Sequence, residues 1–157
     1  MSECARTLGP PETLDYYDVR RVQLPVSLTP LEVWNLIMRD PQPVLRVAFA
    51  VRDAISTRFG VKRIGGFSGQ AHESVQVGAY LDFFLVEHIG PDFMLLTERD
   101  RHLDVMTCIA CDNGCVTVTS SVVTHNLYGR IYMLPVGLAH KWIVSGMLRR
   151  LKRRLQR

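Results

Sequence analysis

The chain has 157 residues, of which 47% are hydrophobic, so it is long enough for one domain with a sizeable core, and global disorder is excluded. Its nineteen cations and fifteen acids give a formal charge of +4, but six of the cations lie between Arg149 and Arg157. The first 148 residues therefore carry a formal charge of −2. A nucleic-acid-binding domain usually spreads its cations over a folded face, so nucleic acid is not an expected partner.

The N-terminal residues 1–15 lack the apolar segment of a signal peptide and contain Pro10 and Pro11. We expect a disordered leader over residues 1–15 and one domain over residues 16–157. No apolar run has the length expected of a transmembrane helix, and a cytoplasmic location is the default expectation.

The first half of the domain combines one strand with two helices. Residues 16–24 suit a strand. Thr29, Pro30 and Glu32 form the cap, first-turn proline and capping-box acid of a helix that ends at Asp40-Pro41. A second helix begins at Pro43 and ends near Gly60, where a C-terminal glycine belongs. The proline-rich connection predicts a helical hairpin.

From residue 62 to residue 126 the pattern changes to short runs that favour strands, separated by turn residues. Predicted strands cover residues 80–88, 93–98, 102–111 and 115–125. Gly90-Pro91-Asp92 and Asp112-Asn113-Gly114 join them, and the second of these is a strong hairpin signal. Connections this short predict antiparallel neighbours.

The segment from Met133 to Arg157 predicts one long helix, with Pro135 in its first turn. A core-facing stripe recurs at helical spacing and comprises Val136, His140, Ile143, Val144, Met147, Leu148, Leu151 and Leu155. The last turns are strongly basic. They suit a solvated helix end that extends past the body, and the alternatives are an anionic partner, a membrane surface or nucleic acid.

This order of elements predicts an α+β fold in which a curved antiparallel sheet wraps around the long C-terminal helix. The two-helix hairpin after the first strand would cover the open side of the sheet. Such an arrangement often leaves a cavity between the sheet and the helix.

Several short motifs occur in a fixed order over most of the chain from Tyr16 onward. They are Arg52-Asp53-Ala54 to Phe59-Gly60, His102-Leu103-Asp104, Val123-Thr124-His125-Asn126, Gly129-Arg130-Ile131-Tyr132, Pro135 and His140. In this order they resemble a bacterial family known as domain of unknown function 2867, and the element order resembles the helix-grip (START, Bet v 1, SRPBCC) superfamily. The resemblance implies a helix-grip fold with a ligand-sized interior. In some relatives such a domain follows an NAD(P)-binding domain, but this chain has no nucleotide-binding glycine motif, and we expect no cofactor.

Five polar residues are candidates for the polar end of a pocket, at one end of the sheet. They are His102, Asp104, His125, Tyr132 and His140. His102 and Asp104 lie two apart in a predicted strand and would share a face. Hydrogen bonds that fix the sheet or a ligand are the favoured interpretation. A His–carboxylate pair for acid–base catalysis and a divalent metal site are the alternatives, and no metal is expected because no close histidine pair is present.

The spacing of Cys108, Cys111 and Cys115 superficially resembles a metal or cluster site. A fourth nearby cysteine is missing, and Cys108 and Cys111 would point to opposite faces of one strand. Free thiols are the expected state, and a bridge between Cys111 and Cys115 is possible on oxidation.

Large soft side chains are numerous for one domain and suit either a core or an apolar ligand. They include Phe83, Phe84, Phe93, Met94, Met106, Met133 and Met147. Three functional hypotheses follow. The first is a domain that binds a small or medium-sized apolar ligand. The second is a cyclase-, dehydratase- or hydrolase-type enzyme with a His–Asp pair, and the third is an interaction module that docks through its basic tail. A homodimer is possible but not required.

Overall fold

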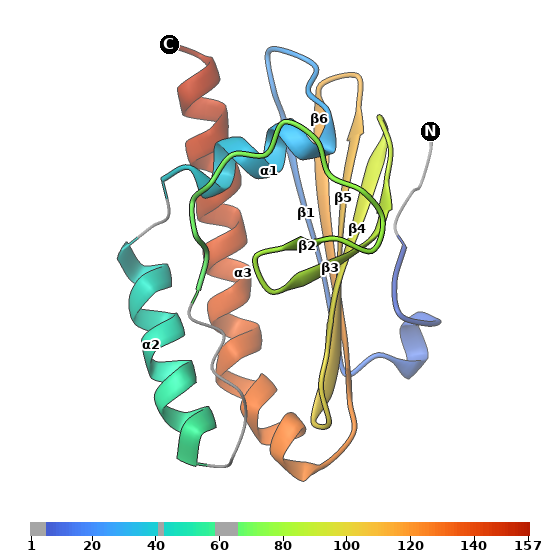
Figure 1. Cartoon of the computed structure of the whole chain (residues 1–157), viewed down its shortest axis with the longest axis vertical. Helices are drawn as coiled ribbons and strands as arrows, with labels where there is room; N and C mark the ends of the chain where they lie inside the picture. Colours follow the sequence, from blue (N-terminus) through green and yellow to red (C-terminus); the bar gives the residue numbers. More distant parts are fainter. Residues whose placement is uncertain (1–5, 41–42, 59–65) are drawn as a thin grey trace.

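The computed structural model describes residues 6–40, 43–58 and 66–157 (Figure 1). Over these residues the chain has an α+β fold, as the sequence predicts. Its elements are a 3₁₀ turn Pro11–Thr13, β1 Tyr16–Gln23, α1 Pro30–Met38, α2 Pro43–Arg58, β2 Tyr80–Leu81, β3 Phe84–Ile89, β4 Phe93–Arg99, β5 Leu103–Asp112, β6 Cys115–Thr124 and α3 Leu127–Leu155.

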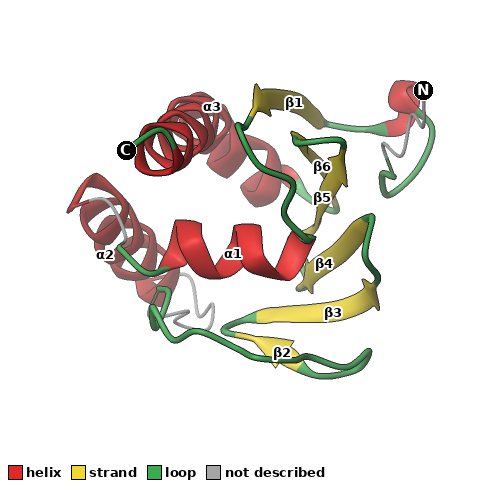
Figure 2. Ribbon diagram, turned by 90° about the horizontal axis from the view of Figure 1, so that it is seen from above, coloured by secondary structure: helices red, strands yellow, loops and turns green. Residues whose placement is uncertain are grey.

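The strands form one antiparallel sheet in the order β1-β6-β5-β4-β3-β2. Figure 2 shows the strands along an arc, with all three α-helices on its concave side. α3 packs against β1 and β6, and α1 packs against β4, β5 and α3. The predicted curved antiparallel sheet with a long C-terminal helix is therefore confirmed.

The predicted hairpin at Asp112-Asn113-Gly114 is confirmed. Asp112 pairs with Cys115, which leaves Asn113 and Gly114 as a two-residue turn. Both turn residues have positive φ, 48° and 78°. Asparagine and glycine adopt this conformation most readily, which explains their place in the turn.

The strand predicted over residues 80–88 is wrong, because the chain turns back within it. Leu81 pairs with Phe84, so β2 and β3 form a tight hairpin around Asp82 and Phe83. Asp82 has φ 54°, and its Oδ1 accepts a hydrogen bond from the Ser68 N–H at 3.1 Å. An aspartate tolerates this backbone region better than most residues, so the turn needs no glycine.

α1 begins as the sequence predicts. The Thr29 hydroxyl accepts from the Glu32 N–H, and Glu32 Oε2 accepts from the Thr29 N–H at 2.7 Å. The helix lies inside the arc of the sheet, where Val33 and Trp34 are almost completely buried (Figure 2). α1 thus carries much of the core.

α2 begins at Pro43, as predicted, and Gly60 lies outside the described residues. α1 and α2 do not form the expected antiparallel hairpin, because α2 turns sharply away from α1 and runs beside α3 (Figure 1). α2 is therefore the outermost layer on the concave side.

α3 begins six residues earlier than predicted, at Leu127, and Pro135 lies inside it. The Asn126 side chain caps the helix by accepting from the Gly129 N–H at 3.0 Å. Proline removes the hydrogen bond to the carbonyl of Ile131 and normally disrupts a helix. Ile131 is 58% exposed, which places that turn at the surface of the molecule.

The sheet buries apolar residues on both faces. The larger cluster lies under the helices and includes Trp34, Leu96, Ile109 and Leu148. A smaller cluster on the convex face contains Leu95, Met106 and Cys108, with Leu8 and Phe93 packed against it. The Leu8 N–H also donates to Ser121 Oγ at 3.2 Å, so part of the expected disordered leader is placed against the sheet.

Candidate functional site

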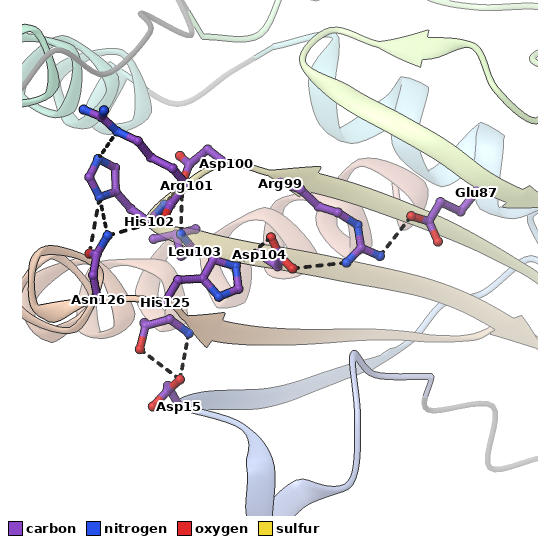
Figure 3. Close-up of polar contacts among 11 residues, drawn as sticks. Asp15, Glu87, Arg99, Asp100, Arg101, His102, Leu103, Asp104, His125 and Asn126 are labelled. Atoms are coloured by element: carbon purple, nitrogen blue, oxygen red, sulfur yellow. Dashed lines mark hydrogen bonds and ion pairs between the residues drawn. The ribbon is translucent and has the colours of Figure 1, made fainter.

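His102 lies one residue before β5 and contacts the start of α3. Its Nδ1 is 2.9 Å from Asn126 Nδ2, and its Nε2 is 3.2 Å from Arg101 Nε. The His125 N–H donates to the His102 carbonyl at 2.7 Å. These contacts join the start of β5 and the end of β6 to the cap of α3 (Figure 3), and His102 is only 9% exposed.

Asp104 and His125 form a pair on the convex face of the sheet. Asp104 Oδ1 is 3.1 Å from His125 Nε2, and Asp104 Oδ2 accepts from Arg99 at 3.2 Å. Arg99 also contacts Glu87 Oε1 at 3.2 Å, and this hydrogen bond is the main cause of its raised pKa. The row Glu87, Arg99, Asp104 and His125 crosses from β3 through β4 and β5 to the end of β6 (Figure 3), and the His125 side chain is 39% exposed.

His140 lies on the other face of the sheet, between α3 and β1. Its Nδ1 is 3.2 Å from the Tyr16 hydroxyl, which is also 3.2 Å from the Gly137 carbonyl. Burial lowers the pKa of His140 and raises that of Tyr16 to about 12. Asp18 extends this polar group, where it pairs with Arg20 at 2.9 Å.

Tyr132 belongs to a third group at the boundary of α2 and α3. Its hydroxyl accepts from Arg52 Nε at 3.3 Å, and Arg52 pairs with Asp53 at 2.9 Å. Burial is the main cause of the raised pKa of Tyr132. The ring centroid of Tyr128 lies 6.2 Å from that of Tyr132, with the rings stacked, and 4.4 Å from that of His102. Tyr128 therefore bridges these two residues.

The five predicted site residues therefore do not converge. The structure brings Asp104 and His125 together on the convex face, links His102 to Tyr132 through Tyr128, and places His140 with Tyr16. The expected common face for His102 and Asp104 is wrong, because β5 begins only at Leu103.

Sequence reasoning missed an aromatic cluster on the concave side. The centroid distances from Trp34 to Phe67 and Phe84 are 5.7 and 6.0 Å. Phe49 of α2 contacts Phe67 at 5.2 Å and Phe83 at 5.8 Å. The sequence identifies Phe83 and Phe84 as large apolar residues that suit a core or a ligand. Their partners lie too far away in the sequence for any local pattern to reveal them.

The indole nitrogen of Trp34 is buried in this cluster, and it has no hydrogen-bond partner among the described residues. Trp34 is only 3% exposed, so bulk water does not supply one. Buried polar groups almost always have a partner, and an unsatisfied N–H costs about 1–3 kcal/mol. This donor therefore needs an explanation.

The cysteines form no disulfide within the part of the chain that the structure describes. Cys108 is buried on the convex face and Cys111 packs on the concave face, as predicted. Cys111 pairs with Val116 and Asp112 with Cys115, so Cys111 and Cys115 point to opposite faces. The bridge considered for them is disfavoured by this register. Residues 6–40, 43–58 and 66–157 contain no His/Cys/Asp/Glu group that could hold a metal ion.

The basic end of α3 is not a free tail throughout. Arg154 donates to the Leu36 carbonyl at 3.1 Å and to Asp40 at 2.5 Å, and Leu151 is 2% exposed. A small groove lies beside these contacts between α1 and α3, and its lining includes Leu36, Ile37, Met147 and Arg150. The last turns of α3 therefore pack on α1, which differs from the expected extension past the body.

By length and composition α3 is apolar enough to cross a bilayer, contrary to the sequence-based expectation. A single such helix is weak support for a membrane span, since helices of soluble proteins pass the same test. In the most apolar stretch of 18 residues in α3, however, only 17% is buried, which is little for a core helix.

Comparison with known proteins gives one match. Residues 11–147 match the family described as "Protein of unknown function (DUF2867)". No curated protein and no solved structure matches the chain.

Proposed function

Because the chain belongs to the DUF2867 family, whose description states no activity, we propose a function from the geometry. The protein is a helix-grip domain that binds a small or medium-sized apolar ligand between α2 and the concave face of the sheet. The buried and unpartnered indole N–H of Trp34 is the observation that carries this proposal.

The surroundings of Trp34 suit such a ligand. The rings of Phe67 and Phe84 contact Trp34, and Phe49 packs on Phe67 behind them; aromatic side chains provide large apolar contact areas. Among the described residues of this cluster, the Trp34 N–H is the buried polar group left without a partner. The ligand class is therefore apolar with at least one hydrogen-bond acceptor, such as a carbonyl oxygen.

α2 is the cover of this site. It contributes Phe49 to the aromatic cluster, and Arg52 holds it to Tyr132 of α3. Leu45 and Ser56 of this helix are buried, whereas its outer side is exposed. A movement of α2 would open the aromatic cluster while the sheet, α1 and α3 keep their mutual contacts.

The first experiment is native mass spectrometry of the purified protein, followed by solvent extraction. The expected result is a stoichiometric small molecule that leaves only on denaturation. The second is titration with prodan, an apolar fluorescent probe that carries one ketone oxygen. Trp34→Phe keeps an aromatic ring but removes the donor, and should weaken binding by about threefold to tenfold.

The chain offers a matched control, because Trp142 is its second tryptophan and is 80% exposed. Trp142→Phe should leave prodan binding unchanged. If Trp142→Phe weakens binding while Trp34→Phe does not, the probe occupies the outside of α3 and the proposed interior site is wrong.

Acid–base catalysis is the second candidate function, and the 3.1 Å contact between Asp104 and His125 favours it. A carboxylate at this distance can orient a histidine that acts as a general base. This pair lies on the opposite face of the sheet from Trp34, so it can act on the extracted compound only after that compound has left the interior site. If the extracted compound is chemically changed by wild-type protein but not by His125→Gln, catalysis replaces simple binding.

A further inference from the structure

α3 exposes a row of large apolar side chains to solvent. They recur at spacings of three and four residues, and we call them the α3 stripe: Leu127 (70% exposed), Ile131 (58%), Leu134 (71%), Leu138 (65%) and Trp142 (80%). Residues at this spacing lie on one side of a helix. Fifteen residues of helix separate the ends of the row, a length of about 22 Å.

The opposite side of α3 already has partners. Gly137 and His140 contact Tyr16 of β1, and Leu148 and Leu151 are buried in the main core. A helix that is apolar on all sides is normally covered on all sides. α3 is covered on one side only, and contiguous exposed apolar surface of this kind marks an interaction site.

α2 has an exposed apolar row of its own. Val47, Val51 and Ile55 lie four residues apart and are 64%, 54% and 46% exposed. Arg52 of α2 donates to Tyr132 of α3, which ties the two helices together, and both views show them as neighbours in the outer layer (Figures 1 and 2). The apolar surface therefore belongs to a two-helix layer.

The charges of α3 have one sign. Residues 127–157 contain eight cations and no acid. Arg149 and Arg153 are exposed and, at helical spacing, continue the side of the helix that carries Trp142. The acid of α2 is Asp53, which is paired with Arg52. A second copy docked on this layer would supply apolar surface but no anions for these cations.

We propose that the α3 stripe and the basic end of α3 bind the surface of an anionic lipid bilayer. The apolar side chains would enter the boundary between headgroups and acyl chains, with Trp142 at the level of the headgroups. The cations beyond Trp142 would contact the anionic headgroups. Because the inner side of α3 stays packed on β1, the helix lies along the bilayer and does not cross it.

The test is co-sedimentation with lipid vesicles and the emission of Trp142. Vesicles of phosphatidylcholine with roughly 30% phosphatidylserine should bind the protein, and those of phosphatidylcholine alone should bind it far more weakly. Trp142 emission should shift to shorter wavelength on binding, and the shift should be absent in Trp142→Phe, because Trp34 is already buried. Neutralising Arg149, Arg153 and Arg157 with glutamine should weaken binding roughly a hundredfold, at about fivefold for each cation.

The stripe itself is tested by Leu134→Glu together with Leu138→Glu. Both residues are exposed, so the fold should survive, which circular dichroism checks, and vesicle binding should be lost. The matched control is Val26→Glu with Val77→Glu, at two exposed apolar residues in loops, and it should keep most of the binding. Equal loss in both double variants would overturn the proposal. So would a wild-type dimer that ignores vesicles and dissociates in the stripe variant, since a second copy would then cover the stripe.

Discussion

Gly129 lies directly against the backbone carbonyl of His102. A β-carbon at position 129 would overlap this oxygen, and it would also lie 3.3 Å from Cβ of Thr124. The first turn of α3 therefore touches the strand connection before β5 without any side chain between them. This contact fixes where the long helix leaves the sheet, and it explains a glycine at a position where helix propensity favours alanine.

Replacing Gly129 with alanine should destabilise the protein by about 1–3 kcal/mol, the usual cost of overpacking. In an unconstrained helix the same change would stabilise by about 1 kcal/mol, so the sign of the effect is informative. Urea unfolding followed by circular dichroism measures it. A stabilised variant would mean that α3 and His102 are not in contact.

The elements with local signals were predictable. The capping box of α1 and the Asn113-Gly114 turn depend on residues within three positions of one another, and both occur as expected. The predicted start of α3 was wrong, because proline is typical of a first helical turn and Pro135 instead lies inside the helix. The true cap is Asn126, whose side chain accepts from Gly129.

The prediction that the five polar residues form one site was wrong for a different physical reason. Side chains alternate between faces only inside a strand, so a residue that lies before the strand need not share a face with the residue two positions later. β5 begins at Leu103, which leaves His102 outside the alternation and turns Asp104 toward His125. The contact of Trp34 with Phe84 joins segments fifty residues apart, and no local pattern encodes such a distance.

His140 should make the stability of the protein depend on pH. Burial lowers its pKa in the folded state, whereas the unfolded value stays near 6.5. Above pH 6.5 the ring is neutral in both states, so its contribution is complete. As the pH falls below 6.5 the unfolded chain binds the proton first, and stability decreases until the folded pKa is passed.

His140→Gln removes the titrating group and should flatten this decrease below about pH 6.5. Urea unfolding at several pH values measures the effect. His72→Gln is the control, since His72 pairs with Asn35 through its backbone N–H and carbonyl. An equal slope in wild type and His140→Gln would contradict the prediction.

Tyr132→Phe should loosen α2 without unfolding the domain. It removes the hydroxyl that accepts from Arg52, a hydrogen bond whose net contribution is about 0.5–1.5 kcal/mol. Hydrogen exchange should therefore accelerate over residues 43–58 and remain unchanged in β5 and β6. Tyr17→Phe is the control, because Tyr17 is 45% exposed on β1. Acceleration throughout the chain would show global destabilisation instead.

The thiols should differ in reactivity. Burial raises the pKa of Cys111 to about 12, so at pH 8 only about one molecule in 10⁴ carries the thiolate that reacts. Cys108 is fully buried and should be equally slow, whereas Cys115 is partly exposed at the start of β6. In a Cys4→Ser background, titration of the native protein with a disulfide reagent should show one fast thiol, lost in Cys115→Ser. Denaturation should then release the thiols of Cys108 and Cys111, which form no disulfide within the described residues.

A fast phase that persists in Cys115→Ser would mean that β5 opens far enough to expose Cys111 or Cys108. Cys111→Ser would then identify which of these two thiols reacts.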